Sequence, residues 1–175
     1  MAADDIVIVA ATRTPFGKFG GKLKDVPTVD LGVHVVRQLM DDSGLAPEQI
    51  DELDFGCCIS AETQGVAPVV ARQILLKAGL PAERPSISID RACCSGLSAC
   101  QWAWRSIRLG EAAVAVAGGA DNMSRTPHLV RGLRWGVKLG SPEMEDPLYK
   151  MEYKAFNPVS VDAGEVALAH GEDRE

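Results

Sequence analysis

Residues 86–100 read SISIDRACCSGLSAC, and they join a strand pattern to a helix pattern through two adjacent cysteines. Residues 86–90 alternate serine and isoleucine up to Asp90, which predicts a short strand. Residues 95–109 carry apolar side chains at helical spacing and are followed by Gly110, a common helix stop. The two cysteines, Cys93 and Cys94, therefore fall at the carboxyl end of a strand, where α/β proteins bind ligands.

The same alternation of strands and helices extends on both sides of this stretch. Further strands are predicted over residues 6–10, 53–59 and 113–117, and further helices over residues 28–43 and 66–78. This order predicts an α/β fold with right-handed crossovers. The strands are almost entirely apolar, which predicts a mainly parallel sheet in αβα layers, with helices on both faces.

Apolar periodicity also predicts which side of each element faces the core. The expected core positions are Leu31, Val35, Leu39 and Met40 on the first helix, alternate residues from Leu53 to Ile59 on the second strand, and Leu97, Cys100, Trp104 and Ile107 on the third helix. After Gly119 the periodicity ends, and residues 120–160 form a long irregular stretch of a kind that is often functional. We therefore divide the chain into residues 1–119 and residues 120–175.

Composition excludes several classes of protein. The 175 residues have a formal net charge of −6 and a pI near 5.1, which disfavours a nucleic-acid binder. The N-terminus carries acidic residues where a signal peptide has basic ones, and no apolar run has the length of a membrane span. We therefore expect a cytoplasmic protein without a membrane segment, whose cysteines stay reduced.

The five cysteines do not form a metal-binding pattern. They occur as Cys57-Cys58, Cys93-Cys94 and Cys100. Structural zinc sites space their thiolates by about two to four residues, and adjacent strand residues point to opposite faces. We therefore predict no metal site.

Cys93 has two interpretations from its local sequence. A helix N-terminus offers unpaired N–H groups and a partial positive charge, which stabilise a thiolate. The arrangement is similar to the strand–nucleophile–helix turn of serine hydrolases, with sulfur replacing oxygen. Alternatively, both cysteines are small buried residues at a tight joint, since free cysteine is often buried. The local pattern leaves the two interpretations open.

Four segments together resemble the thiolase family. They are VIVAATRTPFGKFGGKLKDV at 7–26, GVAPVVARQILLKAGLP at 65–81, RACCSGLSA at 91–99 and VAGGADNMSRTPH at 116–128. The third is similar to the family's Cys-x-Ser-Gly-Leu segment, and the fourth to Gly-Gly-x-Glu-x-Met-Ser, with Asp121 in place of glutamate. The resemblance implies the N-terminal half of a thiolase fold, the start of its loop domain after residue 119, and Cys93 as the acyl-accepting nucleophile.

The resemblance also implies an acyltransferase activity. The Cys93 thiolate would take an acyl group from a 3-ketoacyl-CoA and pass it to coenzyme A, or catalyse the reverse Claisen condensation. Coenzyme A is then a substrate, and no cofactor is implied. The family's acid–base residues lie in its C-terminal half, and none of His34, His128 and His170 has the Gly-His-Pro context. We therefore expect this chain to need a complementary C-terminal chain and to form an oligomer of such pairs.

A basic stretch in the irregular region is a second candidate site. Arg125, Arg131, Arg134 and Lys138 lie within fourteen residues that contain no acid. Positive fields attract anions, so Arg131 and Arg134 are candidate contacts for coenzyme A phosphates. The alternatives are a solvated loop and a surface for a protein partner. The three tryptophans, Trp102, Trp104 and Trp135, are expected in the core or at an interface.

Two other functions remain open. The segment IDRACCSG at 89–96 is similar to the nucleophile segment of ketosynthase-type condensing enzymes, which share the thiolase fold. A dependence on acyl-carrier protein rather than acyl-CoA would favour that class. The other alternative is a subunit without catalytic activity that binds acyl-CoA or acts as a scaffold. It is favoured if alkylation of Cys93 leaves the activity of the assembled protein intact.

Overall fold

The structure is a computed structural model that describes residues 5–62, 69–148 and 159–172. It consists of two compact units, Met1–Arg125 and Thr126–Glu175, and each is described by itself. No helix within the described ranges is long and apolar enough to cross a membrane.

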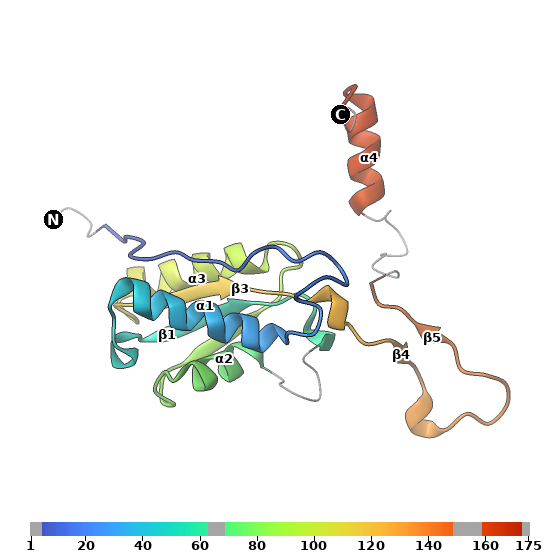
Figure 1. The fold of residues 1–175 in the computed structure, drawn as a ribbon, viewed down its shortest axis with the longest axis horizontal. Helices are drawn as coiled ribbons and strands as arrows, with labels where there is room; N and C mark the ends of the chain where they lie inside the picture. The colour runs from blue at the N-terminus through green and yellow to red at the C-terminus, as the bar shows by residue number, and fades with distance from the viewer. Residues whose placement is uncertain (1–4, 63–68, 149–158, 173–175) are drawn as a thin grey trace. The chain divides into compact units, whose positions relative to one another are not determined.

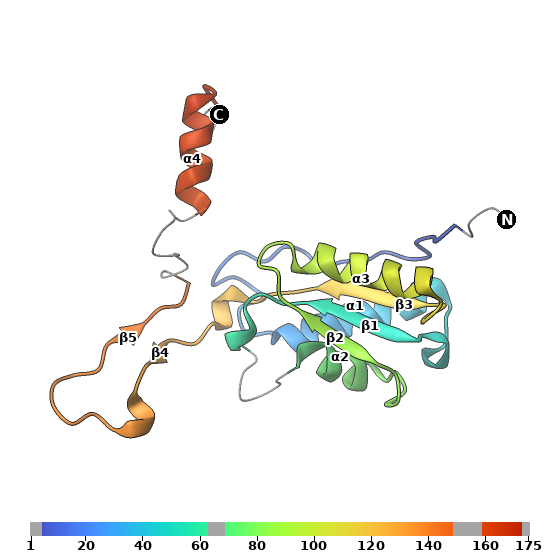
Figure 2. The same ribbon diagram turned by 180° about the vertical axis from the view of Figure 1, so that it is seen from behind.

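The first unit is a three-stranded parallel sheet between two layers of helices (Figures 1 and 2). Its elements are α1 (Thr28–Ser43), β1 (Glu52–Gly56), α2 (Val70–Ala78), β2 (Ser86–Ile89), α3 (Ser95–Leu109) and β3 (Ala115–Gly119). The strand order is β2-β1-β3, and Leu53 of β1 pairs with Ser86 on one side and Val116 on the other. Helices α1 and α2 cover one face and α3 the other. The predicted α/β layering with a parallel sheet is confirmed.

The main core lies between the sheet and the pair α1 and α2. Leu53 and Phe55 of β1 are almost completely buried there, against residues of the two helices: Val29, Val33, Val36, Ile74 and Leu75. The strand ends at Gly56, short of the predicted Ile59, and all five of its residues are buried, so the predicted alternation is wrong, although Leu53, Phe55, Cys57 and Ile59 are all buried as expected. The stripe predicted for α1 is rotated, since Leu31 and Val35 are only half-buried. The buried side of α1 instead carries Val29, Gly32, Val33 and Val36.

The strand predicted over residues 6–10 is absent, and that prediction is wrong. These residues have no regular structure, and Val7, Ile8 and Val9 are exposed. An apolar run forms a strand only where a neighbouring strand supplies hydrogen-bond partners, and none of the described strands pairs with this segment. Residues 66–68 of the predicted second helix lie outside the described residues, and α2 begins at Val70.

The apolar face predicted for α3 is also wrong. Leu97, Cys100 and Trp104 are exposed, while the helix turns its small residues toward the sheet: Ser95, Ala99, Ala103 and Ser106. Small side chains let the helix axis approach the strands closely, and the large apolar ones are left outside. Trp102 and Trp135 are exposed too, so none of the three tryptophans belongs to the core.

The second unit has little regular structure. A short antiparallel pair joins β4 (Leu129–Val130) to β5 (Met144–Glu145), and α4 spans Val159–Ala169. This unit also has a 3-10 turn at Leu133–Trp135. In the first unit, 3-10 turns occur at Pro47–Gln49, Ser60–Glu62 and Met123–Arg125. The predicted division after residue 119 lies six residues before the division between the units.

Candidate functional site

Cys93 lies in the turn that joins β2 to α3. Its side chain is exposed, and Cys94 is the residue that precedes the first turn of the helix. The turn is closed by two backbone hydrogen bonds, from Cys94 N to Arg91 O at 3.1 Å and from Ser95 N to Ala92 O at 3.0 Å. Cys93 is therefore presented at the N-terminus of a fifteen-residue helix, where the helix dipole favours a negative charge.

Two glycines of the sheet bring the start of α3 close to the strands. A Cβ atom at Gly56 would lie only 2.5 Å from Gly96 N, and one at Gly119 would lie 3.0 Å from Gly56 O. Side chains at these positions would push the helix away from the sheet. At Gly96 itself a Cβ atom would be 4.0 Å from its nearest neighbour, Gly119 Cα, which is an ordinary contact distance. The close approach that sets the position of Cys93 depends on Gly56 and Gly119.

A cavity of about 570 Å³ opens beside Cys93 within the first unit. Its walls come from the N-terminal residues 12–19, 23 and 24, from Leu31 and Val35 of α1, from Gly56 and the turn that contains Cys93, and from residues 117–124 at the end of β3 and beyond it. The cavity is large enough for a small organic group. Cys93 is thus an exposed thiol that faces a cavity, and the interpretation as a buried packing residue is wrong.

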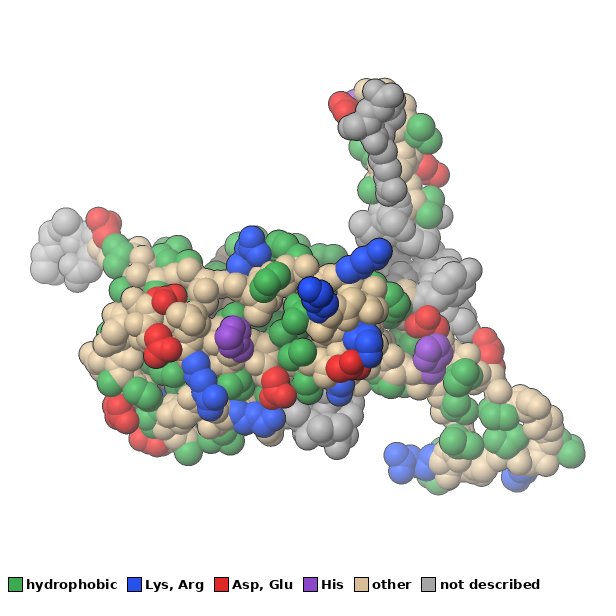
Figure 3. Space-filling view, in the orientation of Figure 1, with side chains coloured by type: hydrophobic (Ala, Val, Ile, Leu, Met, Phe, Trp, Pro, Cys, Tyr) green, Lys and Arg blue, Asp and Glu red, His purple; other side chains and the backbone are tan. Residues whose placement is uncertain are grey.

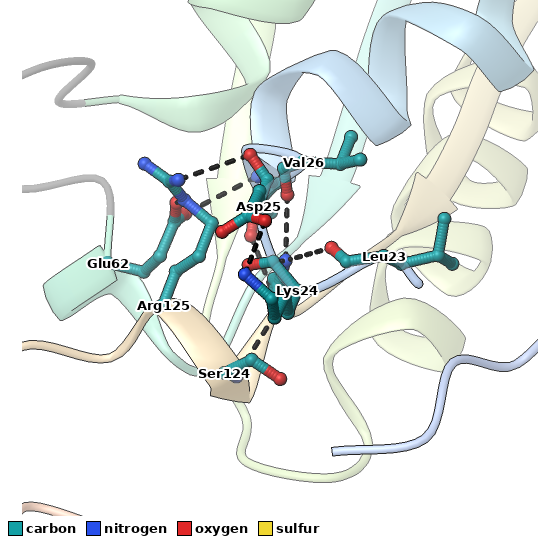
Figure 4. Close-up of polar contacts among 9 residues, drawn as sticks. Leu23, Lys24, Asp25, Val26, Glu62, Ser124 and Arg125 are labelled. Atoms are coloured by element: carbon teal, nitrogen blue, oxygen red, sulfur yellow. Dashed lines mark hydrogen bonds and ion pairs between the residues drawn. The ribbon is translucent and has the colours of Figure 1, made fainter. Parts of the chain in front are cut away.

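Asn122 fixes one wall of this cavity. Its side-chain amide donates hydrogen bonds to Leu23 O at 2.9 Å and to Val26 O at 2.7 Å, and its backbone N–H donates to Thr28 Oγ1 at 3.1 Å. Figure 4 shows these contacts around the turn that precedes α1. Sequence reasoning singled out the neighbouring Asp121 and missed Asn122. The only signal was its place inside the motif at 116–128.

An ion pair lies next to this network. Arg125 Nε contacts Glu62 Oε1 at 2.5 Å, and the guanidinium also donates to Asp25 O at 3.2 Å (Figure 4). Glu62 is buried and Arg125 is partly exposed. This member of the basic stretch therefore joins the segments that follow β1 and β3, and its charge is already paired.

The other adjacent cysteines lie at the end of β1 and have the opposite environment. The thiol of Cys57 donates to Asp121 Oδ1 at 3.4 Å, and that of Cys58 to Oδ2 at 3.1 Å. Burial, together with the Asp121 carboxylate, raises the pKa of each thiol to about 12. Asp121 also accepts the Ile59 N–H at 2.7 Å. These two thiols are held protonated and are not candidate nucleophiles.

The predicted phosphate contacts lie in the second unit. Arg131 pairs with Glu145 across β4 and β5, with 3.1 Å from Nε to each carboxylate oxygen, and Arg134 is exposed on the turn Leu133–Trp135. The basic residues that line the cavity are others, Arg13, Lys18 and Lys24. Figure 3 shows Lys and Arg side chains interspersed with acidic and hydrophobic ones on the face that it presents. The N-terminal segment was missed as a source of positive charge because its lysines are separated by glycines.

The histidines take no visible part in the site. His34, His128 and His170 are all exposed, and none of them lines the cavity beside Cys93. The described residues therefore supply a thiol, helix-terminal amides and cationic side chains, and the acid–base histidine that the resemblance implies is not among them.

Comparison with known proteins decides the family. The sequence model of the family described as "Thiolase, N-terminal domain" matches residues 6–175. This chain belongs to the thiolase family. The chain is 38% identical over 174 residues to an acetyl-CoA acetyltransferase of Pseudomonas aeruginosa, covering 98% of this chain and 44% of that protein. It is 41% identical over 144 residues to an acetyl-CoA acetyltransferase of Cupriavidus necator, covering 82% and 36%.

A solved structure supports the same thiolase assignment. The crystal structure of the Bacillus anthracis acetyl-CoA acetyltransferase superposes with a TM-score of 0.77 at 38% identity, over 82% of this chain and 36% of that one. The thiolase-like fold is thereby confirmed. The chain spans less than half the length of these relatives.

Proposed function

We propose that this chain carries the nucleophile of a thiolase and that Cys93 is that nucleophile. The observation that carries the proposal is the exposed Cys93 thiol at the start of α3, facing a cavity of about 570 Å³. Its four fellow cysteines differ: Cys57 and Cys58 are held protonated by Asp121 and burial, and Cys94 and Cys100 do not line the cavity.

The proposed reaction proceeds in two balanced steps. The Cys93 thiolate attacks the 3-keto carbon of a 3-ketoacyl-CoA, the C2–C3 bond breaks, and the leaving acetyl-CoA carbanion takes a proton from an acid. The thiolate of free coenzyme A then attacks the acyl-Cys93 thioester, so that acyl-CoA forms and the Cys93 thiolate returns. Covalent catalysis of this kind divides one difficult step into two easier ones.

A complementary segment of the C-terminal thiolase type is the second part of the proposal. Its acid–base groups would protonate and deprotonate the carbanion. The exposed apolar side chains support a protein surface that another segment covers: Val7, Ile8 and Val9 near the N-terminus, and Leu97, Trp104 and Leu109 on α3. We further propose that pairs of this kind assemble into an oligomer in the cytoplasm.

Trapping of the acyl-enzyme tests the role of Cys93. The chain, mixed with a C-terminal thiolase half, is incubated with acetyl-CoA and analysed by mass spectrometry of the peptide that contains Cys93. We expect one acetyl group, which Cys93→Ser removes and Cys94→Ser retains. Acetylation that survives in Cys93→Ser would disprove the assignment.

The complementary segment is tested by activity. We expect residues 1–175 alone to show no thiolysis of acetoacetyl-CoA, and addition of a C-terminal half to restore it. Turnover by residues 1–175 alone would show that the complementary segment is unnecessary. Activity that persists after complete alkylation of Cys93 would favour a binding or scaffold role for the chain.

A further inference from the structure

We infer that Ser95 is a positioning residue, whose hydroxyl group holds Ala92 in a left-handed backbone conformation and thereby sets the direction of Cys93. The consequence for acyl transfer rests on the proposed function, but the geometry and its test do not.

Ala92 has an unusual backbone conformation. Its φ is +48°, and among the described non-glycine residues only Val69 also has a positive φ. For an alanine this conformation is disfavoured, because Cβ approaches the following carbonyl oxygen. Residues in such conformations persist only where the surrounding structure holds them, and they gather at functional sites. Ala92 immediately precedes Cys93, so its backbone angles decide where the thiol points.

The Ser95 hydroxyl group adds two hydrogen bonds to the two backbone hydrogen bonds that close this turn, and it is the side chain that contacts both Arg91 and Ala92. Its Oγ donates to Ala92 O at 2.6 Å and accepts the Arg91 N–H at 2.8 Å. The two bonds close a small ring around the peptide that joins Arg91 to Ala92. Ser95 itself is only 3% exposed, and both of these hydrogen bonds are partly buried. An additional bond runs from Ala92 N to Asp90 Oδ1 at 3.0 Å, but Asp90 is exposed and this bond is open to solvent.

Ser95 is itself anchored from the sheet. A Cβ atom at Gly56 would collide with the backbone of Ser95, so the first turn of α3 rests directly on β1. The hydroxyl group therefore acts from a fixed point, and it transmits the position of the sheet to the turn through the backbone of Ala92. In this way the packing of α3 on β1 determines the direction of the Cys93 side chain.

The test uses the chain's own cysteines as reporters. The full chain is treated with a limiting amount of iodoacetamide, and the alkylation rate of every cysteine is measured by peptide mapping. Cys100 is exposed on the same helix and serves as the reference, and the slow labelling of Cys57 and Cys58 reports that the fold is intact. In Ser95→Ala we expect the ratio of the Cys93 rate to the Cys100 rate to fall about tenfold, because both partly buried hydrogen bonds of the hydroxyl group are lost.

Two further variants separate positioning from general stability. Ser106→Ala removes an equally buried serine, 3% exposed, from the same face of α3, and it should leave the ratio unchanged. Ala92→Gly/Ser95→Ala should restore the ratio, because glycine adopts a positive φ without strain. Where Ser95→Ala alone speeds the labelling of Cys57 and Cys58, the comparison is made between Ala92→Gly and Ala92→Gly/Ser95→Ala, whose ratios should be equal.

Two results would overturn the inference. One is a ratio in Ser95→Ala that stays within about twofold of the unmodified chain while Cys57 and Cys58 remain slow. The other is a double variant whose ratio stays as low as that of Ser95→Ala, since Ser95 would then not act through Ala92. Alkylation requires no acyl-CoA, so a failure of the proposed acyl transfer leaves this readout unaffected.

Discussion

Two pairs of adjacent cysteines occupy equivalent places in the fold and have opposite properties. Cys57-Cys58 follows β1, and Cys93-Cys94 follows the neighbouring strand β2 in the same parallel sheet. After β1 the chain turns beneath the Asp121 carboxylate, which accepts both thiols. After β2 a short turn over residues 90–94 leads into α3, and both thiols in this turn are exposed. The comparison teaches that the groups placed beyond the end of the strand, a carboxylate or a helix N-terminus, decide the chemistry of such a pair.

The largest expected effect is a difference in reactivity between the two pairs. A thiol with a pKa of about 12 is almost fully protonated at pH 8. Its thiolate fraction is roughly a thousandfold below that of an ordinary cysteine, whose pKa is about 8.5. In the native protein we expect iodoacetamide to modify Cys93 first, and Cys57 and Cys58 roughly a thousandfold more slowly. Peptide mapping over time measures the rates.

Asp121→Asn sharpens this comparison. The variant keeps an oxygen for the Ile59 N–H but removes the negative charge that disfavours both thiolates. Because burial is the larger cause of the raised pKa values, we expect only about a tenfold gain in the rates of Cys57 and Cys58. Asp41→Asn, on the exposed side of α1, is the control. In the native protein without these substitutions, labelling of Cys94 before Cys93 would contradict the proposal that Cys93 is the nucleophile and would favour Cys94.

The comparison also shows which parts of the fold and site were predictable. The order of strands and helices could be predicted because apolar periodicity and the glycines after α1, α2 and α3 act locally. Cys93 was singled out by the resemblance of RACCSGLSA to the thiolase nucleophile segment, and its role stays a prediction. The inward face of α3 could not be predicted, because periodicity favours Leu97 and Trp104 whereas the helix buries its small residues Ala99 and Ala103.

The missed features depend on contacts between distant segments. Asn122 reaches Leu23 and Val26 across almost one hundred residues, and Asp121 reaches Cys57 and Cys58 across more than sixty. No local pattern carries such information. The prediction of a strand at residues 6–10 failed for a related reason. A strand needs a hydrogen-bonded neighbour, and none of the described strands pairs with this apolar run.

A second carboxylate tests the same contrast through stability. Asp54 of β1 is completely buried beside Glu52, whereas Asp121 accepts hydrogen bonds from three groups. Burial, with the nearby charge of Glu52, raises the pKa of Asp54 from 3.8 to about 7. The folded state therefore keeps a proton that the unfolded state has lost, and stability falls as pH rises from about 4 to about 7.

We expect this group to change the free energy of unfolding by a few kcal/mol between pH 4.5 and 8, at about 1.4 kcal/mol per pKa unit. Urea unfolding at several pH values measures the effect. Asp54→Asn should flatten the profile because the amide does not titrate, and Asp42→Asn on the exposed side of α1 should leave it unchanged. A slope that is equally steep in Asp54→Asn would show that another group binds the proton.

The smallest expected effect concerns the binding of coenzyme A, and it compares the two units directly. Arg134 is exposed, whereas the charge of Arg131 is already neutralised by Glu145 at 3.1 Å. If the second unit contacts the phosphates, Arg134→Glu should weaken binding severalfold at low salt and Arg131→Glu should weaken it less. Both effects should shrink near physiological ionic strength, where exposed charges are screened beyond about 8 Å. Calorimetric titration at two salt concentrations measures the affinity for coenzyme A.

If neither variant changes the affinity at low salt while Arg13→Gln or Lys18→Gln does, the phosphates bind beside the Cys93 cavity in the first unit, because those two side chains line it. The basic stretch of the second unit would then be a solvated loop or a surface for a protein partner.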